Sequence, residues 1–233
     1  MNILALDTSS RFASIAVLND DRIQLEYNFS SEDNLSSLLI PSLQFLLKSL
    51  KLKPEDIDVF GIGIGPGLFT GIRIGLATLK GMLFGLRKPF VPVVTLHALA
   101  FKFVDSVRSI IPLIDAKRNE VYMGCYRSDE GGLVEAMEPA LLGMNPLLER
   151  IRQCEDKIFV GSGAETYRNW LRSNFKDGKL FYRSHFLASE IGKIAFQQYR
   201  NKNFQVDLQK LLPFYLRKPD AETALPQKRA DPN

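Results

Sequence analysis

The sequence has few of the residues on which disulfide frameworks and metal sites depend. Its 233 residues include two histidines and two cysteines, and the cysteines, Cys125 and Cys154, lie far apart without CxxC spacing. We expect both thiols to be reduced rather than joined in a disulfide or bound to a metal. So few scattered ligands are also too few for a metal site of the usual ligand count. The sequence therefore predicts no metal centre.

Long hydrophobic runs and blocks of like charge are also missing. No apolar stretch is expected to be long enough to span a bilayer, and the first residues lead into a strand without the features of a secretory signal. The net charge of +4 is spread along the chain, which indicates a solvated surface rather than a nucleic-acid-binding block. These features predict a cytoplasmic globular protein that makes no membrane contact.

The most informative segment present is a glycine-rich run at residues 65–75, GPGLFTGIRIG. It follows a buried strand predicted at 57–64 and leads into a helix predicted at about 69–84. Glycines permit positive φ or the close approach of another group, and a helix N-terminus can bind an anion. The run lacks the lysine of a GxxxxGK(S/T) loop and fits GxGxxG poorly. A βα turn with glycines for close helix packing explains it equally well.

Strand and helix patterns alternate along the chain, and the pattern occurs twice. Each half begins with a strand that ends in an aspartate, Asp7 or Asp115, and continues into a hairpin. The alternation predicts an α/β protein with mixed sheets and covering helices. We expect an N-terminal α/β lobe over residues 1–108, a C-terminal α/β lobe over 109–217 and a polar, mobile tail over 218–233.

Several strings taken together are more specific than any one of them. They are ILALDTS at residues 3–9, the glycine-rich run, DAKRNEVY at residues 115–122 and PFYLR at residues 213–217. In these strings the chain resembles the bacterial TsaB (YeaZ) family, over nearly its whole length. The resemblance implies the two-lobed fold of actin, sugar kinases and Hsp70 (the ASKHA fold), with duplicated mixed sheets and covering helices. The doubled pattern read from the residues agrees with that fold.

The resemblance also implies a function. It describes a non-catalytic scaffold that pairs with TsaD as a heterodimer and acts with the ATPase TsaE. Together these proteins transfer a threonylcarbamoyl group from threonylcarbamoyl-AMP to the adenosine beside the anticodon of tRNA. We expect this chain to contact tRNA only indirectly and to form a homodimer through the same surface when TsaD is missing.

The surface expected to bind the partner consists of apolar positions on two helices of the first half. Small residues between them, Gly75, Ala77 and Gly81, would let another helix approach closely. The same apolar spacing also fits helices that only cover their own sheet, and both interpretations stay open here. The predicted partner-binding residues are Leu35, Leu38, Leu39, Ile72, Leu76, Leu79 and Leu83.

A second group of candidate residues concerns nucleotide binding. Asp7, Thr8, Ser9, Gly65 and Gly67 occupy the places where relatives of the implied fold handle phosphates and a cation. Ser9 stands where those relatives usually have a glycine, which narrows the room for a phosphate. We therefore expect a degenerate nucleotide pocket. No cofactor is expected to be required, and ATP or ADP is a candidate ligand at the partner interface.

Two enzymatic functions are the alternatives. A small-molecule kinase of the same fold would turn over ATP and would depend on Asp7. A metallopeptidase-type glycoprotease is less favoured, because TsaD carries two metal-binding histidines at i and i+4 of a helix, whereas here His97 is followed by Phe101. The other histidine, His185, has no carboxylate pattern around it in the sequence. No catalytic residue and no metal ligand is therefore predicted.

Overall fold

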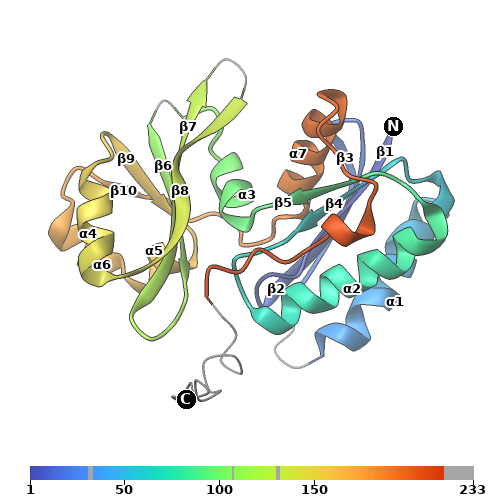
Figure 1. Cartoon of the computed structure of the whole chain (residues 1–233), viewed down its shortest axis with the longest axis horizontal. Helices are drawn as coiled ribbons and strands as arrows, with labels where there is room; N and C mark the ends of the chain where they lie inside the picture. Colours follow the sequence, from blue (N-terminus) through green and yellow to red (C-terminus); the bar gives the residue numbers. More distant parts are fainter. Residues whose placement is uncertain (31–33, 107, 130–131, 218–233) are drawn as a thin grey trace, which may run out of the picture.

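The computed structural model describes residues 1–30, 34–106, 108–129 and 132–217, which form two five-stranded sheets with helices packed on them (Figure 1). The predicted tail at residues 218–233 lies outside the described residues. The first sheet is formed by the first half of the chain and the second sheet by the second half.

The two sheets share one topology. Their strands are β1 (Asn2–Asp7), β2 (Phe12–Asn19), β3 (Arg22–Ser30), β4 (Val59–Gly63), β5 (Phe90–Val93), β6 (Ser109–Asp115), β7 (Glu120–Asp129), β8 (Gly132–Gly143), β9 (Lys157–Val160) and β10 (Lys179–Leu180). The order is β3-β2-β1-β4-β5 in the first sheet and β8-β7-β6-β9-β10 in the second. In the first sheet the central strand β1 pairs antiparallel with β2 and parallel with β4. In the second sheet β6 pairs in the same way, antiparallel with β7 and parallel with β9. The predicted duplication of mixed sheets is thus confirmed.

Helices cover both faces of the first sheet. The helices of the chain are α1 (Leu35–Ser49), α2 (Phe69–Leu86), α3 (Thr95–Phe101), α4 (Met144–Arg152), α5 (Ser162–Thr166), α6 (Arg168–Asn174) and α7 (Ala188–Arg200), with short 3-10 turns η1 (Pro54–Asp56) and η2 (Leu208–Lys210). Side chains alternate between the faces of a strand. Leu4 and Leu6 of β1 therefore join the core under α1 and α2, while Ile3 and Ala5 join the core under α7.

Helix α7 belongs to the second half of the sequence but packs on the first sheet (Figure 1). The helix lies close to the sheet because a glycine stands on each side of the contact, Gly192 on α7 and Gly61 on β4. A Cβ added to Gly192 would lie 2.2 Å from a methyl carbon of Leu18, and one added to Gly61 would lie 3.0 Å from Ile191. The lobe boundaries drawn from the sequence stay a prediction, but α7 and its contacts lie with the first sheet.

Helix α2 is an exception to the expectation that no apolar segment is long enough to cross a membrane. Among the described residues it is the one helix that reaches the length and apolar composition of a membrane span, with 18 residues. Its packing accounts for this composition, because Ile72, Leu76, Leu79 and Leu83 form a stripe at helical spacing that is buried against the sheet. Length and composition alone are therefore weak evidence for a span here.

Candidate functional site

The glycine-rich turn packs directly on the loop that follows β1. The Leu68 amide donates a hydrogen bond of 2.6 Å to the Ser9 carbonyl oxygen, and the Thr8 hydroxyl donates one of 2.8 Å to the Gly71 carbonyl oxygen. A Cβ on Gly67 or Gly71 would lie 2.1 Å from the carbonyl oxygen of Ser9 or Thr8, respectively. These glycines are therefore required for backbone-to-backbone packing, which supports the packing explanation of the run.

Asp7 lies at the bottom of this loop and is fully buried. Its Oδ1 accepts a hydrogen bond of 3.1 Å from the Ser9 amide, and no described group donates a hydrogen bond to Oδ2. Burial raises the pKa of this carboxyl to about 6. A Cβ on Gly63 would lie only 2.4 Å from Oδ1, so the neighbouring strand closes over the carboxylate. Asp7 is thus enclosed by protein.

A cavity of about 840 Å³ lies between the two sheets, beside this loop. Of the predicted nucleotide-binding residues, Ser9 and Gly67 line it, whereas Asp7, Thr8 and Gly65 do not. The structure therefore brings only two of the five to the surface of the cavity. The carboxylate on which a kinase function was predicted to depend is not among them.

Aromatic and charged side chains form the walls of the cavity. The His185 ring stacks on Phe12 at a centroid distance of 4.9 Å, and its Nε2 lies 3.1 Å from a carboxylate oxygen of Glu165. The sequence shows no carboxylate pattern around His185, and the fold brings Glu165 to it from α5. The sequence offered no signal for this pairing, because the three residues come from β2, α5 and the segment before α7.

The segment after η2 closes one side of the cavity. The Phe214 amide donates to the Ile64 carbonyl oxygen at 2.8 Å, which ties this segment to the end of β4. Arg217 then donates to the carbonyl oxygen of Ala116, in the β6–β7 turn, at 2.7 Å and pairs with Glu120 at the start of β7. One short segment thus links the first sheet to the second across the cavity.

The predicted partner-binding residues lie on α1 and α2, but most of them face the sheet. Leu35 is half-buried and Leu38 is 42% exposed. The remaining five are at most 5% exposed: Leu39, Ile72, Leu76, Leu79 and Leu83. This corrects the prediction for those five positions. Their spacing marks the stripe that each helix turns toward its own sheet, so the core interpretation holds for them.

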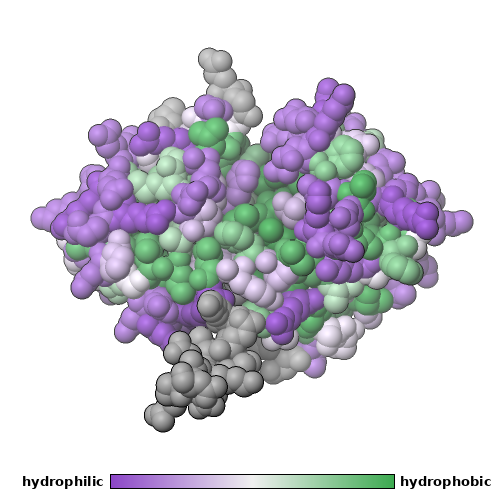
Figure 2. Space-filling model, viewed as in Figure 1, coloured by the Kyte–Doolittle hydropathy of each residue, from purple (hydrophilic) through white to green (hydrophobic). Residues whose placement is uncertain are grey.

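The outer face of α1 and α2 carries different residues. Phe84 is 81% exposed and Phe45 is 59% exposed, both unusually high for such large apolar side chains. Ala77 is exposed as well, and a Cβ added to Gly81 or Gly85 would meet no atom within 4 Å. These three small residues repeat every four positions and form a shallow stripe along α2. Figure 2, viewed as Figure 1, shows hydrophobic side chains reaching the surface among hydrophilic ones around these helices. We call these five residues the outer helical face.

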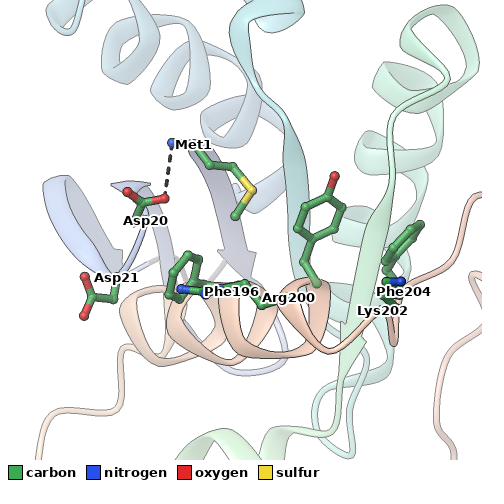
Figure 3. A pocket seen from close by; sticks show the side chains of 8 residues that line it. Met1, Asp20, Asp21, Phe196, Arg200, Lys202 and Phe204 are labelled. Carbon is green, nitrogen blue, oxygen red and sulfur yellow. Dashed lines mark hydrogen bonds and ion pairs between the residues drawn. The ribbon is translucent and has the colours of Figure 1, made fainter.

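A second hollow, of about 850 Å³, lies at the far end of the first sheet (Figure 3). It is bordered by the β2–β3 turn and by the end of α7. The amino group of Met1 pairs with Asp20 at 3.3 Å, while Arg200 and Lys202 lie across from the acidic turn. Because acidic and basic groups offset one another, the hollow has no strong preference for an anion or a cation. No residue predicted from the sequence lies in it.

Metal ligands do not gather in the part of the chain that the structure describes. Within it, no three side chains of His, Cys, Asp or Glu come close enough together to hold an ion. His97 packs on Tyr126 with a centroid distance of 5.5 Å, and burial lowers the pKa of its imidazole. His97 is half-buried, and among the described residues its ring packs on an aromatic side chain rather than beside other metal-binding groups. The absence of a required cofactor stays a prediction.

Comparisons with known proteins agree on one relationship. A family model described as "TsaD: tRNA N6-adenosine threonylcarbamoyltransferase" matches residues 30–225. The chain is 28% identical over 235 residues to the tRNA threonylcarbamoyladenosine biosynthesis protein TsaB of Escherichia coli, covering 98% of this chain and all of that protein. It is similar to the structure of YeaZ from Pseudomonas aeruginosa, with a TM-score of 0.77 and 26% identity, covering 92% of this chain and 99% of the other.

A more distant structure indicates the fold alone. It is the activator of the 2-hydroxyisocaproyl-CoA dehydratase from Clostridium difficile, with a TM-score of 0.53 and 13% identity. The similarity covers 87% of this chain and 97% of the activator. The duplicated sheets therefore occur in proteins with little sequence in common.

Proposed function

Because this chain belongs to the TsaB (YeaZ) family of tRNA threonylcarbamoyladenosine biosynthesis proteins, we propose that it serves that pathway as a non-catalytic subunit. In this proposal it binds TsaD through the outer helical face and holds the catalytic protein in an active arrangement. The fold is the ASKHA fold that the sequence resemblance implied. Fold alone does not assign a function, so the proposal depends on family membership and on the surface described above.

The small-residue stripe on α2 is the observation that carries the binding proposal. Glycine inside a helix is less favourable than alanine by about 1 kcal/mol, and nothing within 4 Å of a Cβ at Gly81 or Gly85 requires the missing side chain. A helix of another protein would account for both glycines, because small residues let two helix backbones approach closely. The exposed rings of Phe45 and Phe84 would then supply apolar anchors at the borders of that contact.

The non-catalytic part of the proposal is supported by the loop after β1. Asp7 is enclosed by Gly63 and Ser9, and Ser9 occupies a position where a phosphate-binding relative has glycine. Neither arrangement leaves the carboxylate open to a nucleotide and its cation. We therefore place the chemistry of threonylcarbamoyl transfer in TsaD and propose no required cofactor for this chain. ATP or ADP at the partner interface would then belong mainly to the partner.

The remaining partners follow from the same proposal. TsaE would act on the heterodimer, and tRNA would be contacted mainly by TsaD. When TsaD is missing, two copies of this chain would pair through the outer helical face, since a face of this kind can be self-complementary. These proteins work on tRNA, and we propose the cytoplasm as the location.

The experiment measures TsaD binding by a variant that changes only this face. Gly81→Arg adds a long side chain into open space on α2, so the chain is expected to fold. We expect the dissociation constant for TsaD, measured by calorimetry, to rise by a factor of about 100 or more, which corresponds to about 2.7 kcal/mol. Gly143→Arg is the matched control, because a Cβ at Gly143 also meets nothing within 4 Å and lies in the second sheet.

Three results would contradict the proposal. The first is a folded Gly81→Arg protein that binds TsaD and supports tRNA modification as the unchanged chain does. The second is ATP turnover by the isolated chain that Asp7→Asn abolishes, which would favour the kinase alternative. A loss of binding by Gly143→Arg equal to that of Gly81→Arg would place the interface elsewhere.

A further inference from the structure

The two cysteines of the chain lie side by side in the second lobe. Cys125 and Cys154 are the only cysteines in the sequence, and their Sγ atoms are 3.3 Å apart. Both are free thiols, and each residue is 1% exposed. The two cysteines are separated by 28 residues, and the sequence did not predict this contact.

The fold of the second lobe brings the two thiols together. Cys125 lies in β7, and its cross-strand partner in β8 is Met137, so these two residues occupy one side of the hairpin. Cys154 follows α4, where its amide donates to the Ile151 carbonyl oxygen at 3.0 Å. The Met137 sulfur lies 3.9 Å from the Cys154 sulfur. Helix α4 packs on the same hairpin, and its end holds the second thiol against the first.

The surroundings distinguish the two thiols chemically. The hydrogen bond with Cys125 lowers the pKa of the Cys154 thiol. Burial opposes this change, and the positive charges of Lys157, Arg127 and Arg150 add to it, so that the net shift is downward. The same hydrogen bond, together with burial, raises the pKa of Cys125. Cys154 is therefore the thiol that ionises first. A thiolate is the reactive form of cysteine, which makes Cys154 the nucleophile of the pair.

We propose that Cys125 and Cys154 are a redox-sensitive pair that a hydroperoxide converts into an intramolecular disulfide. The Cys154 thiolate attacks the terminal peroxide oxygen, the O–O bond breaks, and Cys154 becomes a sulfenic acid. The hydroxide or alkoxide that is released takes up the proton that Cys154 lost on ionising and leaves as water or alcohol. The Cys125 sulfur then attacks the Cys154 sulfur and expels hydroxide, which takes up the thiol proton and leaves as a second water. Two thiols are oxidised and one peroxide is reduced.

Geometry favours this outcome over a structural metal site. The sulfur atoms need to approach only from 3.3 Å to the disulfide length of about 2.05 Å. A structural zinc site would need four ligands, whereas no three His, Cys, Asp or Glu side chains gather among the described residues. The residues that follow Cys154, Glu155 and Asp156, are exposed, so the buried thiol is joined directly to a surface segment.

The test uses the full chain in its reduced, folded form and hydrogen peroxide as the probe. We expect intact-mass analysis to show the loss of two hydrogens, reversed by dithiothreitol, and peptide mapping to join Cys125 to Cys154. In Cys125→Ser the reaction is expected to stop at a sulfenic acid on Cys154, which dimedone traps. In Cys154→Ser we expect little trapping at Cys125, because burial still raises the pKa of that thiol when Cys154 is replaced.

The same experiment contains the results that would overturn the inference. The unsubstituted chain provides the decisive measurement, because it needs no change in a buried position. Retention of both thiols after peroxide treatment, shown by labelling after denaturation, would contradict the proposal, as would disulfides only between molecules. Equal dimedone labelling of the two single variants would contradict the assignment of Cys154 as the nucleophile. None of these outcomes depends on TsaD binding, so the proposed function is tested separately.

Discussion

The Tyr215 ring stacks on the Phe69 ring with a centroid distance of 4.4 Å and an interplanar angle of 21°. This contact holds the segment after η2 on the first turn of α2. Arg73 lies on the Phe69 ring at 3.8 Å and donates from Nε to the Tyr215 hydroxyl at 3.2 Å. Three side chains thus fix the point from which the chain crosses to the second sheet.

Removing the Tyr215 ring is expected to weaken this attachment. Tyr215→Ala loses the stacking and the buried ring area, and we expect the free energy of unfolding to fall by about 2 kcal/mol. Tyr215→Phe keeps the ring and loses only the hydrogen bond with Arg73, for which about 0.5 kcal/mol is expected. Urea unfolding of both variants checks the difference. Equal losses would mean that the stacking contributes nothing.

A pair of glycine variants tests the packing around Asp7. Gly63→Ala places a Cβ 2.4 Å from the Asp7 Oδ1 and 3.2 Å from Ile191, and we expect a loss of about 1–3 kcal/mol. Gly85→Ala adds the same methyl group to a helix where nothing lies within 4 Å, and a gain of about 0.5–1 kcal/mol is expected. Thermal unfolding measures both. A neutral Gly63→Ala would show that the loop relaxes around the carboxylate.

The carboxyl of Asp7 makes stability depend on pH in a defined direction. Its pKa is raised from 3.8 to about 6 by burial, so the folded protein holds this proton more tightly than the unfolded chain does. Stability should therefore fall as the pH rises from about 4 to 6, by about 3 kcal/mol for this group, and then level off.

A variant isolates this contribution from other titrating groups. Asp7→Asn cannot ionise, so it should be more stable than the unchanged chain above pH 6 and should lose that advantage below pH 4. Denaturant unfolding across pH 3.5–7 gives the comparison. If the free energy of unfolding changed with pH in the same way for the two proteins, the pKa of Asp7 would be the same in the folded and the unfolded state.

Two arginine variants compare the stability contributed by a contact that links the two sheets with that of an ordinary surface ion pair. Arg217→Ala removes the contacts with Glu120 and the Ala116 carbonyl oxygen, and we expect a loss of about 1–2 kcal/mol with faster amide exchange in the β6–β7 turn. Arg152→Ala removes an exposed pair with Glu149, worth about 0.5 kcal/mol or less. Hydrogen exchange that is unchanged in Arg217→Ala would show that the closing segment does not restrain the turn.

The sequence predicted the fold better than it predicted the surface. Strand alternation and the repeated aspartates, Asp7 and Asp115, were local signals, and the duplicated sheets followed from them. The side of α2 that faces solvent was harder to predict. An apolar residue such as Leu76 is equally suited to contact with its own sheet and to contact with a partner. The informative residues for the surface were the small ones, Gly81 and Gly85, where an added Cβ would meet no atom of the described residues within 4 Å.

Contacts between distant segments could not be predicted at all. The pairing of His185 with Glu165 and the approach of Cys125 to Cys154 depend on how helices cross the sheets. The spacing of residues within one helix or strand does not indicate how that helix crosses a sheet. The glycine-rich run gave an intermediate result, since the sequence showed that something approaches closely there but did not identify Ser9 as the neighbour.

The return of α7 to the first sheet has a consequence for how the protein is made. Ile191, Ile194 and Ala195 supply one buried layer of that sheet, yet they are synthesised long after its strands. The N-terminal half therefore emerges from the ribosome with one face of its sheet uncovered, and completes its fold only after α7 (Ala188–Arg200) has been synthesised.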